Sequence, residues 1–371
     1  MPKNVVVCCD GTANQFARDN TNVVKLFSVL RQDPATQAAY YHPGLGTMEA
    51  TGALTTFSRR LTKLMGMAVG YSLSNDIRDA YVFLMRFYEP GDRLFMFGFS
   101  RGAYTVRAVA SLVHMYGLIA PGNEPLVPYA IRMMTAVTRV RPSDPAHARK
   151  AMDYFALARG FKSVLGRTEC HPHFVGVWDT VNSIGWIENP LKLPFVADNP
   201  DIAIGRHAVS IDEHRAFFRS HLWRPSASSE THGPADLKQV WFPGVHCDVG
   251  GGYPETESGL SKLALDWMIG EAQAAGLLVD AAKRRRVLGE DGGGCVRPDA
   301  TATAHESLKG WWNLAEFIPK RHDDAATGRE GRRMNLYRRR TIPAGSFVHH
   351  SAFERGDPYR KRLPADAVPV P

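Results

Sequence analysis

A serine at the centre of a glycine-rich turn is the first residue of this chain that could do chemistry. Ser100 lies in the stretch GFSRG, residues 98–102, which matches the G-x-S-x-G pattern of a nucleophile elbow. The apolar run from Arg93 predicts a strand before this turn, and residues 103–113 predict a helix after it. Glycines beside such a serine allow strained backbone angles and let the helix cross close to the strand. The pattern therefore predicts an exposed serine hydroxyl at the tip of a helix.

An aspartate and a histidine follow two later predicted strands. Asp179 ends the apolar run His173–Asp179, and His246 lies in a glycine-rich loop directly after Gln239–Phe242. The carboxyl ends of parallel strands meet at one edge of a sheet, and the order Ser, Asp, His is that of α/β-hydrolases. In ester hydrolysis, Ser100 would attack the carbonyl and His246 would transfer its proton to the leaving alkoxide. Asp179 would orient the imidazole.

The chain contains 14 histidines, so other residues compete for these roles. The alternatives for the base and the acid are His207, His214, His221, His305, Asp212 and Asp248. Asp248 could instead orient the loop of His246, and Cys247 could be a thiol nucleophile, although no elbow surrounds it. A metal bound by His246, Asp248 and Asp10 would also suit hydrolysis. That site is disfavoured because these residues lack metal-ligand spacing on one element.

The loop after the first predicted strand offers backbone amides to a developing oxyanion. The N–H groups of Gly11 and Thr12 could act there with the N–H of Arg101 at the start of the elbow helix. Turn chemistry explains the same loop equally well, because Asp10 could bond local backbone groups. A phosphatase motif of the D-x-D-G-T type is disfavoured, since Cys8 stands where that chemistry needs a nucleophilic aspartate.

Strand and helix patterns alternate along the chain, which is typical of an α/β protein. The expected strands are Asn4–Cys9, Ala38–His42, the run from Arg93, His173–Asp179 and Gln239–Phe242. The expected helices are Asn22–Arg31, Leu73–Tyr88, the elbow helix, Tyr129–Val137, Ala146–Ala158, His207–Phe217 and Leu260–Ala275. We expect an α/β-hydrolase-like fold with a mostly parallel central sheet and helices on both faces.

The whole chain, residues 1–371, is expected to form one such domain. Helical cap or lid insertions are expected around residues 44–71, 120–165 and 280–345. The first of these fits a packing helix better than a mobile flap that faces a membrane, because one short amphipathic stretch is common.

Cysteines and apolar runs indicate the compartment. The five cysteines form no C-x-x-C pair, which argues against a disulfide framework and favours a reducing environment. The N-terminal run is too short for a signal peptide, and no uncharged apolar stretch is long enough for a transmembrane helix. We therefore expect synthesis in the cytoplasm, with export by a dedicated secretion system left open.

The positive charge is concentrated near the end of the chain. The net charge is +8, and residues 281–371 carry 18 Lys and Arg against 11 Asp and Glu. A solvated basic surface is the favoured interpretation, and attraction to anionic lipid headgroups is the alternative. Nucleic-acid binding is not expected, because no recognised binding motif accompanies the charge.

Several segments together resemble one known family. They are DGTANQ, NDIRDAYVFL, PGDRLFMFGFSRGAYTVRAVA, FVGVWDTV, SIDEHRAFF, QVWFPGVHCDVGGGY, LALDWM and HESLKGWW. From Asn4 to about His349 the chain resembles an α/β-hydrolase family, long labelled an uncharacterised domain, that includes the first family of type VI secretion lipase effectors. The resemblance implies a phospholipase A-type hydrolase with Ser100, Asp179 and His246 as its triad. It also implies a phospholipid or other acyl-ester substrate, and an inhibitor (immunity) protein if the chain is a toxin.

The hypothesis at this point is a serine hydrolase of lipid-like carboxylic esters that uses no cofactor. Two alternatives stay open. One is a catalytically idle hydrolase-fold module that binds lipid or protein, and the other is a hydrolase of a thioester or another acyl ester. An intact triad favours the enzyme, since a binding module needs none of the three roles.

Overall fold

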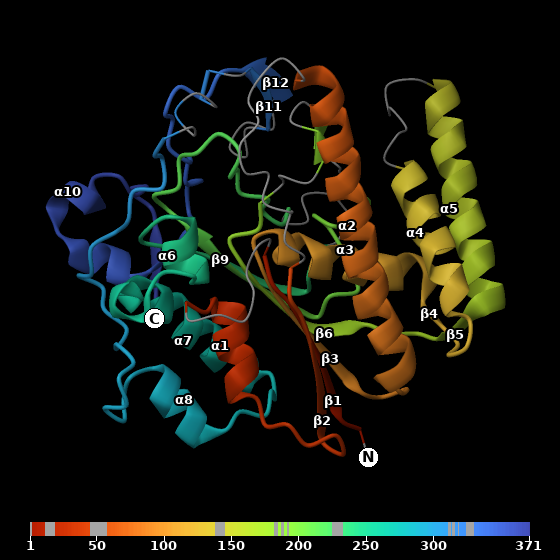
Figure 1. The fold of residues 1–371 in the computed structure, drawn as a ribbon, viewed down its shortest axis with the longest axis horizontal. Helices are drawn as coiled ribbons and strands as arrows, with labels where there is room; N and C mark the ends of the chain where they lie inside the picture. The colour runs from red at the N-terminus through yellow and green to blue at the C-terminus, as the bar shows by residue number, and fades with distance from the viewer. Residues whose placement is uncertain are drawn as a thin grey trace.

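A single parallel sheet organises the molecule (Figure 1). The computed structural model describes residues 2–11, 19–44, 58–137, 145–181, 185–186, 189–190, 193–224, 233–310, 313, 316–317, 319–323 and 330–371. The sheet has eight strands in the order β14-β13-β10-β9-β6-β3-β1-β2, and every neighbouring pair is parallel. The strands are β1 (Asn4–Cys9), β2 (Gln37–His42), β3 (Arg93–Phe99), β6 (Pro172–Trp178), β9 (Ile204–Ser210), β10 (Asp236–Phe242), β13 (Phe347–His349) and β14 (Val368–Val370). The chain reverses its direction of winding between β1 and β3, and ligands bind at such a switch point in α/β folds.

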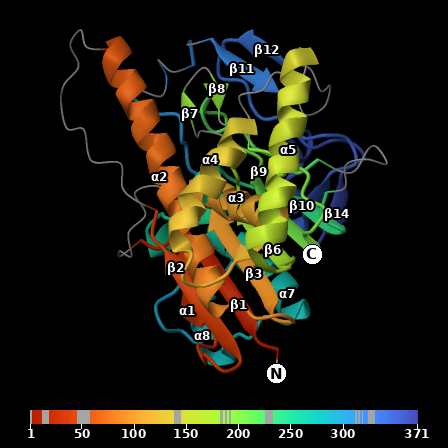
Figure 2. The same cartoon turned by 90° about the vertical axis from the view of Figure 1, so that its right-hand side faces the viewer.

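Helices cover both faces of the sheet (Figures 1 and 2). The main helices are α1 (Asn22–Val29), α2 (Ser58–Phe87), α3 (Arg101–Tyr116), α4 (Val127–Val137), α5 (Pro145–Leu165), α6 (His246–Gly250), α7 (Gly259–Ala274), α8 (Ala281–Val287) and α10 (Asp357–Arg360). The remaining short strands form three antiparallel pairs: β4 (Leu118–Ile119) with β5 (Gly166–Thr168), β7 (Gly185–Trp186) with β8 (Asn189–Pro190), and β11 (Lys320–Asp323) with β12 (Glu330–Arg333).

Alternate residues of each central strand enter two different cores. Val5 and Val7 of β1 pack with α2, α3 and α4, whereas Val6 and Cys8 pack with α1 and α7. Phe95 and Phe97 of β3 join the second core. Both faces are therefore apolar, which explains why the strands appear in the sequence as continuous hydrophobic runs.

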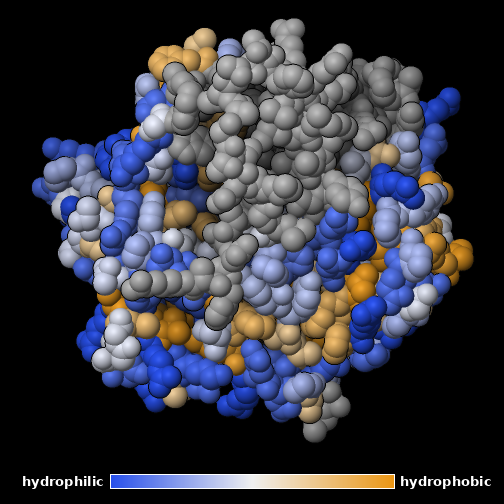
Figure 3. All heavy atoms as spheres, in the orientation of Figure 1, coloured by the Kyte–Doolittle hydropathy of each residue, from blue (hydrophilic) through white to orange (hydrophobic). Residues whose placement is uncertain are grey.

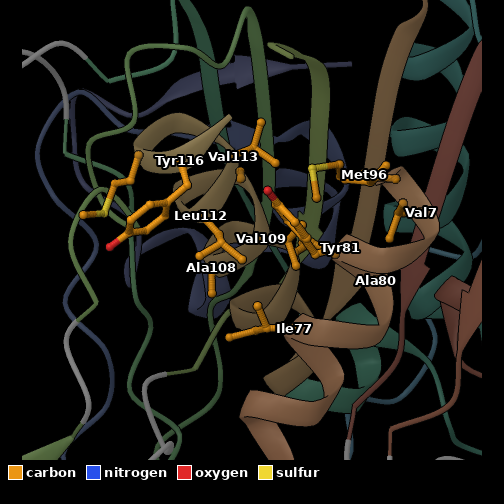
Figure 4. Packing of buried hydrophobic residues seen from close by; sticks show 14 of the residues in the cluster. Val7, Ile77, Ala80, Tyr81, Met96, Ala108, Val109, Leu112, Val113 and Tyr116 are labelled. Carbon is orange, nitrogen blue, oxygen red and sulfur yellow. The ribbon is translucent and has the colours of Figure 1, made fainter. Parts of the chain in front are cut away.

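The helix that follows Ser100 is held by the first of these cores. Figure 4 shows Val109, Leu112 and Val113 of α3 packed near Ile77 and Tyr81 of α2. The Tyr81 hydroxyl is buried but has partners, since it donates to the Gly117 carbonyl at 2.6 Å and accepts from the Ile119 amide at 3.1 Å. The elbow therefore rests on a rigid helix pair.

The predicted fold class is confirmed, and one predicted helix is wrong. The protein has an α/β-hydrolase-like sheet with helices on both faces. Residues His207–Phe217 were expected to be helical, but β9 occupies Ile204–Ser210 and no helix follows it before β10 in the described residues. His207, the first residue of the predicted helix, and Arg206 before it are both buried in this central strand, a position that polar side chains rarely occupy. Arg206 is paired with Asp236 and Glu271.

The insertions expected in the chain are described only in part. Of the segment 44–71, expected to form a packing helix or a flap, residues 45–57 lie outside the described residues, and residues 58–71 form the first half of α2. The predicted helix Leu73–Tyr88 is the second half of α2, and α4 and α5 fill most of residues 120–165. Within the described part of the chain, no helix has the length and apolar character needed to cross a bilayer.

Candidate active site

Ser100 occupies a strained turn between β3 and α3. Its φ angle is +57°, a left-handed conformation that non-glycine residues rarely adopt. The turn needs glycine on both sides, because a Cβ at Gly102 would lie 2.1 Å from the Cys9 carbonyl oxygen. A Cβ at Gly98 would lie 2.5 Å from the Gly102 carbonyl oxygen. The close crossing of α3 over the strands thus presents the serine at their carboxyl ends.

Three side chains that the sequence singles out lie within hydrogen-bond distance in series. Ser100 Oγ is 2.8 Å from His246 Nε2, and His246 Nδ1 is 2.5 Å from Asp179 Oδ2. Asp179 and His246 are buried, whereas Ser100 is partly exposed. Only the serine end of the series therefore opens toward a ligand.

Asp179 is fully buried and is surrounded by donors. Like Ser100 it has a positive φ, of +39°, and its Oδ1 accepts from the Ser210 amide at 3.0 Å. The guanidinium of Arg340 binds both carboxylate oxygens, with Nη2 at 3.1 Å from Oδ2, and its Nη1 also donates to Ser210 Oγ at 2.7 Å. Burial raises the pKa of Asp179, but Arg340 and His246 lower it by more, so the pKa lies well below its usual range. The carboxylate is therefore ionised at neutral pH.

His246 is the first residue of α6, and aromatic rings pack against it from two elements. Phe99, which precedes Ser100, has its ring centre 4.6 Å from the imidazole, and the ring of Phe218 meets it edge-on at 4.9 Å. Gly250 is required at the end of α6, because a Cβ there would lie 1.9 Å from the Phe99 ring. Packing thus fixes the imidazole plane between Ser100 and Asp179.

A second buried carboxylate supports the backbone of His246. Glu213 accepts from the His246 amide at 3.3 Å and is held by Arg215, whose Nη2 lies 2.9 Å from Oε2. Ser307 Oγ donates to its other oxygen at 3.1 Å. Burial raises the pKa of Glu213, but Arg215 outweighs that effect and the pKa falls to about 2. Glu213 is thus a fixed negative charge under the loop that carries the histidine.

The competing histidines have other structural roles. His207 is buried in β9, where burial lowers its pKa to about 3 and its Nε2 accepts from the Thr180 amide. His305 pairs through Nδ1 with Asp248 at 2.6 Å. Burial lowers the pKa of His305, but hydrogen bonds to Glu257 and Asp248 raise it by more. His214 lies 3.2 Å from Glu306, and the His221 carbonyl accepts from the buried Arg107.

The competing acids and the thiol are also engaged elsewhere. Asp212 accepts from the Tyr359 hydroxyl and the Gly244 amide, each at 2.7 Å. Asp248 accepts from the Val245 amide at 3.0 Å, so it orients the start of α6, one of the two roles the sequence left open for it. Burial raises the pKa of Cys247 to about 12, which leaves its thiol protonated.

The loop expected to bind an oxyanion shows turn chemistry. The Gly11 amide donates to Asp10 Oδ1 at 2.7 Å, and Asp10 Oδ2 accepts from the hydroxyls of Thr21 at 2.6 Å and Tyr41 at 3.0 Å. Thr12 lies outside the described residues. Arg101 begins α3, so its amide belongs to the helix N-terminus beside Ser100.

The metal site considered from the sequence has no counterpart in the described residues. Within them, no group of three His, Cys, Asp or Glu side chains could hold a metal ion. Asp10, Asp248 and His246 instead bind Thr21, His305 and Asp179 respectively.

Comparison with known proteins identifies the family. The sequence model described as "T6SS, Phospholipase effector Tle1-like, catalytic domain" matches residues 3–271. The chain belongs to this Tle1-like family. An uncharacterized protein of Saccharomyces cerevisiae is 36% identical over 231 residues, which are 60% of this chain and 33% of that protein. The chain thus spans about a third of the length of this curated relative.

Two solved structures are also similar. The Tle1 effector bound to the VgrG spike of the type 6 secretion system is 18% identical, with 70% of this chain and 52% of that chain covered and a TM-score of 0.34. The Vlm2 thioesterase domain is 12% identical, with 75% and 96% covered and a TM-score of 0.25.

The match to the Tle1-like catalytic domain ends before several residues that support the candidate site. Ser307 and Arg340 lie beyond residue 271, and no sequence pattern indicated that either of them contacts the candidate site. Arg340 stood in the basic run expected to be solvated, yet it is buried against Asp179. The only sequence feature that included Arg340 was that basic run. Glu213 and Phe218 both belong to the segment SIDEHRAFF, which contributed to the family resemblance, but the sequence analysis assigned neither of them a role.

Proposed function

We propose that this Tle1-like protein is a serine hydrolase that cleaves carboxylic esters of lipids with Ser100, His246 and Asp179. The series of short contacts from Ser100 Oγ to His246 Nε2 and from His246 Nδ1 to Asp179 is the observation that carries the proposal. It has the connectivity that nucleophile, base and orienting acid require.

The chemistry follows from these contacts. As Ser100 Oγ attacks the ester carbonyl carbon, its proton passes to His246 Nε2 and the carbonyl electrons move to oxygen. His246 returns the proton to the alkoxide as the C–O bond breaks, which leaves an acyl group on Ser100. Water then attacks the acyl carbon while the same imidazole removes its proton. His246 returns that proton to Ser100 Oγ as the bond between Oγ and the acyl carbon breaks and the carboxylic acid leaves. Asp179, held ionised by Arg340, stabilises the imidazolium in both halves.

We propose that the backbone amide of Arg101, together with that of Gly11 or Thr12, stabilises the oxyanion by hydrogen bonds. The position of Arg101 at the N-terminus of α3 supports this, because a helix N-terminus favours negative charge. The Gly11 amide would have to exchange its bond to Asp10 for one to the substrate.

The family description supports a phospholipid as the ester. Export by a type VI secretion system, a cognate inhibitor protein and peripheral contact with anionic membranes belong to the same proposal, and the family description supports only the first of them. The charge of the C-terminal region supports the membrane contact.

A fluorophosphonate probe tests the nucleophile directly. We expect the wild type to be labelled and Ser100→Ala to be unlabelled. Asp179→Asn and His246→Ala should be labelled at least about a hundredfold more slowly, because the serine loses its activated base. Cys247→Ala, next to the histidine, is the matched control and should label normally. Hydrolysis of a short-chain ester and of phospholipid vesicles should follow the same order.

A folded wild type that neither reacts with the probe nor hydrolyses any ester would refute the proposal. That result would favour the idle lipid- or protein-binding module. If the protein hydrolysed acyl thioesters but no oxygen ester, the proposed triad would stand and the proposal of an ester substrate would be refuted.

A further inference from the structure

A short segment after β12 is anchored at both ends beside the candidate active site. At its start, buried Asn335 donates through Nδ2 to the His214 carbonyl at 2.8 Å and also binds Glu316. At its end, buried Arg340 binds Asp179. Between these anchors, residues 336–339 are all exposed. The segment is therefore fixed in position while its middle faces solvent.

The middle of this segment exposes two apolar side chains, and the backbone angles of both residues are unfavourable. Leu336 is 47% exposed and Tyr337 is 45% exposed, and their φ angles are +47° and +61°. Left-handed angles are unfavourable for such residues, and strain of this kind is concentrated at functional sites. Burial within this chain does not account for the strain, because both side chains point substantially into water.

Neighbouring apolar residues extend the exposed surface. Met334 and Phe317 are also exposed, and the Phe317 ring meets that of Tyr337 at 6.0 Å. We call Phe317, Met334, Leu336 and Tyr337 the apolar tip. In the orientation of Figure 1, the C-terminal part of the chain near β12 lies at the upper left of the molecule. Figure 3, in the same orientation, shows hydrophobic residues on the surface there.

Positive charge adjoins the apolar tip. Arg338 and Arg339 are exposed and follow Tyr337 directly. Arg339 also lines a pocket of about 230 Å³ with Arg355 and Arg362. The acids in that wall are Asp212 and Glu306. Asp212 is bound by Arg362 and the Tyr359 hydroxyl and lies 3.5 Å from Arg339 Nη1, and Glu306 lies near His214. Three arginines against two carboxylates leave the wall positive beside the tip.

We propose that the apolar tip, with Arg338 and Arg339, docks onto a bilayer that contains anionic phospholipid. Apolar side chains flanked by arginines match the boundary between acyl chains and negative headgroups. Tyr337 is three residues from Arg340, so their Cα atoms are at most about 11 Å apart. The docked surface is therefore joined by a short, anchored segment to Arg340, which binds Asp179. This inference rests on the proposed function, which includes contact with anionic membranes, and vesicle binding tests the docking separately from ester hydrolysis.

The double variant Leu336→Asn with Tyr337→Asn tests the apolar part. Asparagine tolerates a positive φ, so this change removes the apolar side chains without adding backbone strain. We expect at least about tenfold weaker cosedimentation with vesicles of phosphatidylcholine and phosphatidylglycerol. The matched control is Met152→Asn with Val164→Asn on α5. These two side chains are 71% and 80% exposed, and both residues are distant in sequence from the apolar tip. This control should bind vesicles as the wild type does.

A second variant, Arg338→Gln with Arg339→Gln, tests the charge. We expect at least about tenfold weaker binding to the anionic vesicles at low salt, and a smaller difference from the wild type in 0.5 M salt. The double asparagine variant should remain weaker than the wild type at both salt concentrations.

Activity measurements separate the docking surface from the active site. The tip variants should hydrolyse a soluble short-chain ester as the wild type does and anionic vesicles at least about tenfold more slowly. Ser100→Ala should bind vesicles normally and hydrolyse neither substrate. If no ester is hydrolysed, the proposed function fails while the binding assay still tests the docking surface. The docking proposal would be overturned if the wild-type protein did not bind anionic vesicles, or if the tip variants bound them as the wild type does. Either result would favour a protein partner at the apolar tip.

Discussion

The side chains around Asp179 show how single residues set the charge of the site. A carboxylate that is fully buried is costly unless donors surround it. Here the Ser210 amide, Arg340 and His246 supply them, and the pKa of Asp179 lies below its unfolded value of about 3.9. A lowered folded-state pKa contributes stability above the unfolded pKa, and this contribution is lost as the pH falls below it.

Removal of Arg340 should turn the contribution of Asp179 to stability at neutral pH from favourable to unfavourable. In Arg340→Gln, burial is no longer opposed by the guanidinium, so the pKa of Asp179 rises. We expect the free energy of unfolding at pH 7 to fall by about 3–5 kcal/mol, since an uncompensated buried charge remains. The difference from the wild type should shrink toward pH 4, because the carboxyl of the variant, with its raised pKa, becomes protonated there and no longer leaves an uncompensated buried charge. Urea unfolding between pH 4 and pH 8 measures it.

Two further variants separate this role from a general loss of charge. Arg338→Gln removes an exposed neighbour and should leave the free energy of unfolding within about 0.5 kcal/mol of the wild type. Arg340→Lys keeps the charge without the bidentate fork, so it should lie between the wild type and Arg340→Gln. Equal stability of Arg340→Gln and the wild type at neutral pH would contradict the assigned role.

Local sequence was informative for some residues of the site and not for others. Ser100 and Asp179 could be singled out because each directly follows a strand whose apolar run is visible in the sequence. His246 could be singled out because it lies in the glycine-rich loop after β10. Arg340 could not, because its partner Asp179 is 161 positions away and its neighbours are exposed arginines. A charge run shows composition, and only tertiary contact distinguishes its buried member from its solvated ones.

At the scale of single elements, the crossing of α3 over the sheet depends on glycine. A Cβ at Gly102 would meet the backbone oxygens of Cys9 and Asp10 at 2.1 and 2.5 Å, and backbone cannot move aside as a flexible side chain can. We expect Gly102→Ala to lower the free energy of unfolding by about 3 kcal/mol or more, and to slow probe labelling because Ser100 is displaced.

The matched control for this substitution is Gly160→Ala. Gly160 lies within α5, is exposed, and would place a new Cβ within 4 Å of no other atom. Alanine has the higher helix propensity, so this variant should gain about 0.5–1 kcal/mol. Thermal unfolding compares the two variants. Similar stabilities would show that the crossing is looser than the structure has it.

The position of each strand in the sheet explains whether it could be predicted from the sequence. β1, β3 and β6 are central and apolar on both faces, so their runs predict strands directly. β9 is as buried but carries Arg206 and His207, whose partners lie on other elements, and its polar residues gave a helical pattern. β13 and β14 have three residues each, too few to show any periodicity.

For the molecule as a whole, the C-terminal hundred residues complete the sheet and the site. β13 pairs with β10, β14 pairs with β13, and Val348 and Tyr359 pack in a core with Trp241 of β10. Arg340 and Ser307 reach Asp179 and Glu213 from the same region. These contacts support our proposal that residues 1–371 form one domain, although the family match ends at residue 271.

A chain that ends at residue 271 tests this proposal. It would expose β10 as an edge, open the core around Trp241 and leave Asp179 without Arg340, so we expect aggregation and no probe labelling of Ser100. A chain that ends at residue 366 loses only β14 of these elements, and should stay folded and be labelled, with reduced stability. Gel filtration, near-UV circular dichroism and probe labelling compare both chains with the full-length protein. A monomeric, labelled 1–271 chain would show instead that the matched region folds alone, and that the C-terminal region is an addition to a complete catalytic unit.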